Sequence, residues 1–140
     1  MLNCWEKNNI MMKIIINGVE EDINVQKYIR EHKKIDPSAV RKEDRINLLS
    51  TACMMGDTEL VRGCIDLGVS IDDGWLIENS SYYGHYDIVK ILLENGADPY
   101  GRGSAIFVSH VRCHEKIHIL LKEWVLINRG RKINKILKNE

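Results

Sequence analysis

Apolar and polar positions alternate most clearly between residues 84 and 99. Ile88, Ile91 and Leu92 recur at the three- and four-residue spacing that lines one face of a helix. Gly84 provides a turn before this stretch, and Gly96 stands where a left-handed residue commonly ends a helix. The pattern therefore predicts an amphipathic helix with a glycine at each end.

The same pattern occurs 28 residues earlier in the chain. Three identical pairs align at this spacing: Gly56 with Gly84, Val61 with Val89, and Gly68 with Gly96. A further shift of 28 residues keeps the apolar positions of 117–121 in register, but it places Arg112 and Trp124 where the two glycines stood. Agreement across three copies predicts an internal helical repeat.

Residues 84–98 read G-H-Y-D-I-V-K-I-L-L-E-N-G-A-D, which closely resembles the second helix of an ankyrin repeat. That family typically spells this helix G-H-x-D/E-V-V-K-x-L-L-x-x-G-A-D. The segments before the turn glycines are similar to the family's first helix, because Ala52, Ser80 and Ser81 are small residues where neighbouring repeats approach closely. None of the copies keeps the family's threonine-proline opening.

The resemblance implies an all-α fold, an ankyrin-like helical repeat solenoid, with units at 44–72, 73–100 and 101–128. The usual ankyrin period is about 33 residues, whereas the spacing here is 28. A short-loop variant, in which short loops replace the family's protruding hairpin fingers, is therefore expected. Such units look like those common in ankyrin proteins of large DNA viruses, which suggests a host-interacting protein.

Residues 1–43 are predicted to form a small β-hairpin and a helix, as an N-terminal cap or degenerate repeat. Asn17-Gly18 follows a run of isoleucines and is the strongest short hairpin signal. Asn24 is placed to cap the following helix. Asp36-Pro37 marks a further helix start, because Asp caps well and Pro is favoured at the first helical position.

Residues 129–140 are predicted to form a C-terminal half-repeat cap. Ile133, Ile136 and Leu137 make a helical stripe at first-helix positions, and lysines alternate with them as on a solvated outer face. The rival interpretation is a basic arm that contacts phosphates, which would bind with strong salt dependence.

Composition narrows the classes of function. Twenty basic and twenty acidic residues cancel, so no overall field favours nucleic acid or an anionic membrane as a partner. No apolar run approaches the roughly 18 residues of a membrane span. The four cysteines form no C-x-x-C pair, and with no secretory leader evident we expect reduced thiols and a cytoplasmic protein.

The family resemblance implies a concave binding surface that includes the flank of each first helix. The positions just before the turn residue belong to this flank, and equal spacing predicts that they form one strip: Met54-Met55, Tyr82-Tyr83 and His110-Val111. Methionines and tyrosines are adaptable interface residues. A polar and aromatic rim is expected from Asp73, Trp75, Glu78, Tyr100 and Arg102. Some of the six strip residues could instead pack on the neighbouring repeat, and we expect about half of them to be substantially buried.

Candidate chemistry is sparse. His110, Cys113, His114 and His118 are residue types that bind zinc, but the repeat register distributes them over two helices and a turn, so we expect no metal site. No catalytic motif or phosphate-binding loop is present, and no cofactor is expected.

The sequence therefore predicts a non-catalytic protein-protein interaction module that acts as an inhibitor or adaptor through its concave face. One alternative is a homodimeric scaffold that associates through the exposed edge of the N-terminal hairpin. The other is a nucleotide- or metal-dependent enzyme without a recognisable motif.

Overall fold

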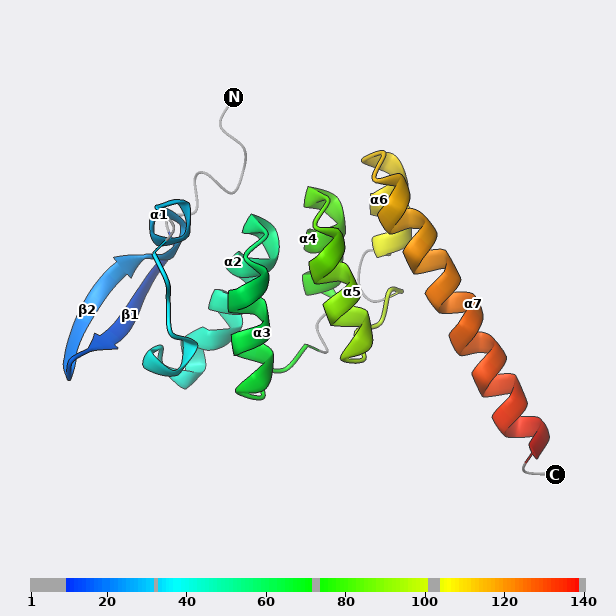
Figure 1. Ribbon diagram of the computed structural model, residues 1–140, viewed down its shortest axis with the longest axis horizontal. Coiled ribbons are helices and arrows are strands. Elements are labelled where there is room, and N and C mark those ends of the chain that lie inside the picture. Colours follow the sequence, from blue (N-terminus) through cyan, green and yellow to red (C-terminus); the bar gives the residue numbers. More distant parts are fainter. Residues whose placement is uncertain (1–9, 32, 72–73, 101–103, 139–140) are drawn as a thin grey trace. The chain divides into compact units, whose positions relative to one another are not determined.

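The computed structural model describes residues 10–31, 33–71, 74–100 and 104–138 (Figure 1). The chain divides into two compact units, Met1–Ser70 and Ile71–Glu140. Both units are mainly helical, and the first also carries a two-stranded antiparallel sheet. The predicted fold class is confirmed at this level: the protein is mostly helical and has a small N-terminal hairpin.

The first unit begins with the predicted hairpin. Strands β1 (Met11–Ile16) and β2 (Val19–Asn24) pair antiparallel across a two-residue turn. Asn17 and Gly18 both have positive φ values, 52° and 81°, as the tight hairpin turn requires. Ile14 also forms an isolated bridge to Val40, so β2 is the outer strand of this small sheet.

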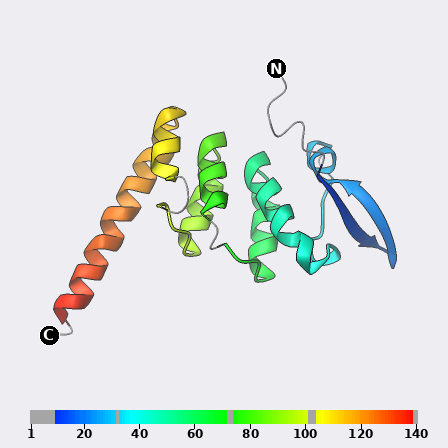
Figure 2. The ribbon, with the colours of Figure 1, turned by 180° about the vertical axis from the view of Figure 1, so that it is seen from behind.

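Short capped helices follow the hairpin (Figure 2). The predicted cap at Asn24 is confirmed: its side-chain oxygen accepts a hydrogen bond from the Lys27 backbone N–H at 2.9 Å and begins α1 (Val25–Arg30). Asp36 caps in the same way, but its segment is only a 3-10 turn, η1 (Pro37–Ala39). A second 3-10 turn, η2 (Lys42–Asp44), leads into the first helical pair.

That pair consists of α2 (Arg45–Met55) and α3 (Thr58–Asp66). Gly56 ends α2 with φ 82°, and the next backbone N–H, from Asp57, bonds back to the Ala52 carbonyl at 3.1 Å. The Asp57 carboxylate then accepts from the Leu60 N–H at 3.0 Å and caps α3. The core of the pair includes Leu48, Leu49 and Val61, all fully buried.

The second unit begins with an equivalent pair, α4 (Trp75–Tyr83) and α5 (Tyr86–Glu94). Gly84 ends α4 with φ 81°, and the His85 N–H bonds to the Ser80 carbonyl at 2.9 Å. Gly96 follows α5 with φ 95°, which confirms the prediction that a left-handed glycine ends this helix. Helix α6 (Ala105–Val111) packs against α4, and α7 (Glu115–Lys138) packs against both α6 and α5 (Figure 1).

The third copy is shifted by one residue from the predicted register. Cys113, not Arg112, takes the left-handed conformation, with φ 58°. The bond that closes the turn runs from the His114 N–H to the Ser109 carbonyl at 2.9 Å, and Ser109 lies 29 residues after Ser80. The counterpart of Leu92 is therefore Leu121, which is fully buried, and not the half-buried Leu120. The spacing from the accepting carbonyl to the left-handed residue is the same in both turns, so the one extra residue lies before α6, between Gly96 and Ala105.

Helix α7 continues where a half-repeat was expected. It runs without interruption from residue 115 to 138, through the predicted boundary at 128. Ile133, Ile136 and Leu137 lie on this extension and are 57–67% exposed. Although α7 has 24 residues, no described helix is both long and apolar enough to cross a membrane.

Candidate protein-binding surface

Two tyrosines end α4 beside the glycine turn of the second unit. The rings of Tyr82 and Tyr83 meet edge to face, with centroids 4.9 Å apart and an interplanar angle of 76°. The Tyr83 ring also stacks near His85, at 6.4 Å. Tyr82 remains 40% exposed. Helix α4 thus presents a pair of aromatic side chains that limit each other's movement.

Arg112 extends this aromatic surface from the turn after α6. Its guanidinium carbon lies 4.3 Å from the centroid of the Tyr82 ring, a cation–π distance. In the 29-residue register, Val111 and Arg112 are the counterparts of Tyr82 and Tyr83. The 28-residue spacing predicted from the sequence pairs the tyrosines with His110 and Val111 and does not identify Arg112. The interval of 29 residues between the two turn-closing bonds is the signal that identifies it.

Phe107 is a second residue that the sequence analysis missed. It lies one turn before Val111 on α6, and the two side chains are 65% and 58% exposed. In the 29-residue register Phe107 corresponds to Glu78, which lies one turn before Tyr82 on the adjacent helix α4. We call the set of exposed and half-exposed residues at this end of the unit the tyrosine surface: Tyr82, Tyr83, Phe107, Val111 and Arg112.

The backbone under the tyrosine surface is fixed by His114. Its Nε2 lies 3.0 Å from the Tyr82 carbonyl oxygen, within hydrogen-bond distance. The same imidazole occupies the space beside Gly84, where an added Cβ would come within 2.7 Å of it. Glycine is therefore favoured at position 84 both by its positive φ and by this close approach.

His110 lies beside helix α7. Its ring centroid lies 5.2 Å from that of His118 on α7. His118 in turn has Nδ1 within 3.3 Å of the Ser109 hydroxyl and 3.1 Å of the Ile106 carbonyl. Within the described residues, no group of three or more histidine, cysteine, aspartate or glutamate side chains could hold a metal ion.

Of the predicted rim residues that the structure describes, Glu78 lies one helical turn from Tyr82, and Trp75 and Tyr100 lie elsewhere. Trp75, 47% exposed, begins α4, and at about 1.5 Å per residue it lies roughly 10 Å along the helix from Tyr82. Glu78 is half-buried on the same helix. Tyr100 lies beside α7, where the Arg129 guanidinium is 5.8 Å from its ring centroid. Asp73 and Arg102 lie outside the described residues.

Met54 and Met55 end α2 in the first unit and are half-buried. They occupy the same place before Gly56 that the tyrosines occupy before Gly84. Because they belong to the other unit, the tyrosine surface is defined without them.

Cys64, one of two buried cysteines described in the first unit, gives no support to a nucleophilic role. Burial raises the pKa of the Cys64 thiol to about 11, and Arg45 offsets this only in part. A nucleophilic cysteine has a lowered pKa, because the thiolate is the reactive form. Cys64 is therefore a packing residue of α3.

Comparison with known proteins identifies one segment. The family model of the ankyrin repeat matches residues 79–103, which include the end of α4, the turn at Gly84 and all of α5. No curated protein and no solved structure matches the chain. The family predicted from the sequence is confirmed: the chain carries an ankyrin repeat at residues 79–103.

Proposed function

We propose that this protein is a non-catalytic protein-binding module that acts as an inhibitor or adaptor by covering the surface of a partner protein with its tyrosine surface. Ankyrin repeats in general are protein-interaction modules. The observation that carries the proposal is the exposed Tyr82 ring, held edge to face by Tyr83 and covered on one side by Arg112. Tyrosine and arginine are enriched at interface hot spots, and rigid rings lose little entropy on binding.

We also propose that the helical pairs are three successive ankyrin-like units of a solenoid, formed by α2 with α3, α4 with α5, and α6 with the first half of α7. Support comes from the shared turn geometry, with closing bonds to the Ala52, Ser80 and Ser109 carbonyls. In this organisation the hairpin and α1 cap the first unit, and the tyrosine surface belongs to the concave flank.

The hairpin gives little support to the homodimer alternative. The outer strand β2 carries three consecutive acidic residues: Glu20, Glu21 and Asp22. A symmetric antiparallel pairing of two β2 strands would bring these carboxylates close together, and like charges across strands are destabilising. Charged outer strands commonly prevent such pairing.

The location that fits this proposal is the cytoplasm. Cys64 and Cys113 carry free thiols, which is the state that a reducing compartment maintains.

The proposal is tested by affinity capture from the native host with mass spectrometry, using the intact chain and a Tyr82→Ala, Tyr83→Ala double variant. Loss of a hot spot worth 2 kcal/mol or more weakens binding by about 30-fold or more. Tyr86→Ala is the matched control, because Tyr86 is 39% exposed on the outer helix α5 and Tyr82 is 40% exposed on α4.

The expected result is a partner that the intact chain and the Tyr86 variant capture and the double variant loses. Circular dichroism and urea unfolding establish that each variant is folded. A partner captured equally by all three chains would show that the tyrosine surface is not the contact.

A further inference from the structure

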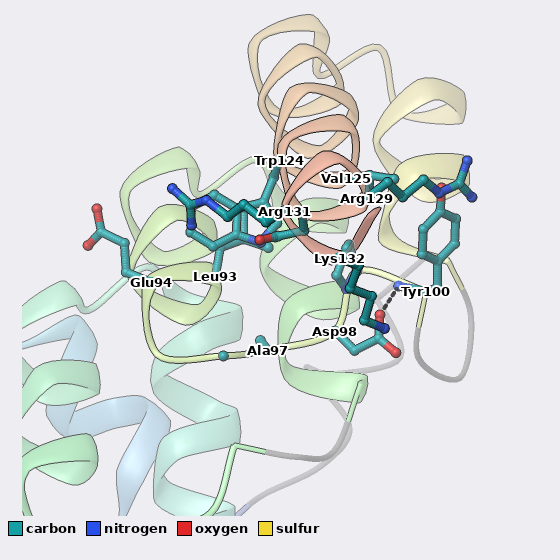
Figure 3. Close-up of a pocket in the computed structure, with 13 residues that line it drawn as sticks. Leu93, Glu94, Ala97, Asp98, Tyr100, Trp124, Val125, Arg129, Arg131 and Lys132 are labelled. Carbon is teal, nitrogen blue, oxygen red and sulfur yellow. Dashed lines mark hydrogen bonds between the residues drawn. The ribbon is translucent and has the colours of Figure 1, made fainter. Parts of the chain in front are cut away.

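A groove in the second unit lies between the loop after α5 and the second half of α7 (Figure 3). Its volume is about 640 Å³, within the range of ligand-binding clefts. The buried side chains of Leu93, Ala97 and Pro99 contribute apolar surface from the α5 side. Trp124 and Val125 contribute it from α7. The groove lies at the opposite end of α5 from the turn at Gly84, so it is separate from the tyrosine surface.

The α7 wall of the groove is basic. Arg129, Arg131 and Lys132 line it, and all three are exposed. None of them forms an ion pair with a carboxylate among the described residues. Figure 3 shows Arg129 beside the Tyr100 ring, Arg131 on the side of Trp124, and Lys132 extending towards the loop. Three cations therefore lie along an apolar cleft without compensating charge on their own wall.

The facing wall is acidic and ordered by its own hydrogen bond. Glu94 and Asp98 line this side. An Asp98 carboxylate oxygen accepts from the Tyr100 backbone N–H at 2.9 Å and holds the loop in a turn. Because two carboxylates stand opposite three cations, the groove carries only a small positive excess. A ligand with a continuous row of phosphates would meet repulsion from this wall.

We propose that this groove binds an acidic peptide segment of a partner protein. One or two carboxylates of the peptide contact the basic α7 wall, and an apolar side chain of the peptide packs into the cleft. Arginine binds carboxylates in a two-pronged geometry that Arg131 can supply, while Lys132 adds a point charge. Trp124 and Tyr100 supply flat apolar surface for the neighbouring side chain. The small charge excess favours such a peptide over nucleic acid, whose phosphates are closely and regularly spaced.

The test is fluorescence anisotropy with the full chain and a fluorescein-labelled peptide of sequence Glu-Glu-Leu-Phe-Glu-Glu. A peptide with lysine in place of each glutamate keeps the apolar centre and reverses the charge. The groove variant is Arg131→Glu with Lys132→Glu. The control variant is Lys135→Glu with Lys138→Glu, which makes the same charge change on the same helix at residues that do not line the groove.

The proposal predicts saturable binding of the acidic peptide, at least a tenfold weaker affinity for the groove variant, and less than a twofold change for the control. The Tyr82→Ala, Tyr83→Ala variant should bind this peptide normally, which separates the groove from the tyrosine surface. Equal losses in the two charge variants would mean unspecific attraction to α7 and would overturn the proposal. Absence of binding by the acidic peptide, or tighter binding of a single-stranded oligonucleotide at 150 mM salt, would also overturn it.

Discussion

Helices α5 and α7 begin in the same way and end differently. Helix α5 starts two residues after the left-handed Gly84, and α7 starts two residues after the left-handed Cys113. Apolar side chains at matching positions in the first turns of both helices are buried. Helix α5 stops after 9 residues at the left-handed Gly96. Helix α7 has Val125 at the corresponding position and continues to 24 residues. The segment that ends α5 carries a left-handed glycine and then Pro99, whereas the corresponding residues of α7, Val125 and Asn128, allow the helix to continue.

This difference shows that apolar periodicity positions a helix but does not set its length. Ile117 and Leu121 of α7 are buried like Ile88 and Leu92 of α5. Beyond Val125 no described large side chain of α7 is buried. The helix continues there because nothing stops it, and its basic side chains form one wall of the groove.

The largest expected effect tests the one-residue shift between α5 and α7. Leu121→Ala should lower the free energy of unfolding by about 3 kcal/mol, since truncation of a fully buried leucine costs about 2–5 kcal/mol. Leu120→Ala should cost about 1 kcal/mol, because Leu120 is half-buried and less contact is lost. Urea unfolding of the two variants measures the difference. A larger loss for Leu120→Ala than for Leu121→Ala would contradict the one-residue shift and support the 28-residue register.

A smaller effect tests the two left-handed glycines at the ends of α5. Gly96→Ala should lower the free energy of unfolding by about 1–2 kcal/mol, because alanine disfavours the left-handed conformation. No neighbouring atom lies within 4 Å of the added Cβ, so no steric cost is added. Gly84→Ala should cost roughly 1 kcal/mol more, because its Cβ displaces His114 and weakens the bond to the Tyr82 carbonyl. Urea denaturation compares the two variants. Equal losses would show that the His114 contact adds nothing to stability.

The smallest effect concerns the extension of α7. Gly130 lies in its interior with no atom within 4 Å of an added Cβ, so Gly130→Ala should increase helicity and stabilise the helix by about 0.5–1 kcal/mol. Gly130→Pro should do the opposite and unwind the end of α7 while leaving the core of the unit folded. Far-ultraviolet circular dichroism measures both changes. Identical spectra for the proline variant and the unaltered chain would contradict a continuous α7.

Local signals in the sequence predicted the elements that local chemistry decides. Asn17-Gly18 gave the hairpin, Asn24 the cap of α1, and the glycines at 84 and 96 the ends of α5. Each of these residues acts through its own backbone preference or its own side chain. They could therefore be recognised without knowledge of the rest of the chain.

The features that were missed depend on residues without a strong preference of their own. Cys113 takes a left-handed conformation that its residue type does not predict. The turn of the third copy was therefore predicted one residue too early, at Arg112. Val125 does not signal that a helix will continue. The partnership of Arg112 with Tyr82 follows only once that shift is known, and the groove joins segments about 30 residues apart, which no local pattern relates.

The most direct test of the proposed function is hydrogen–deuterium exchange of the chain with and without the partner identified by capture. Binding through the tyrosine surface predicts slower exchange at residues 79–84 and 107–112, and unchanged exchange across α5 at residues 86–94. Protection confined to α5 or to the second half of α7, with residues 79–84 unaffected, would contradict the proposal.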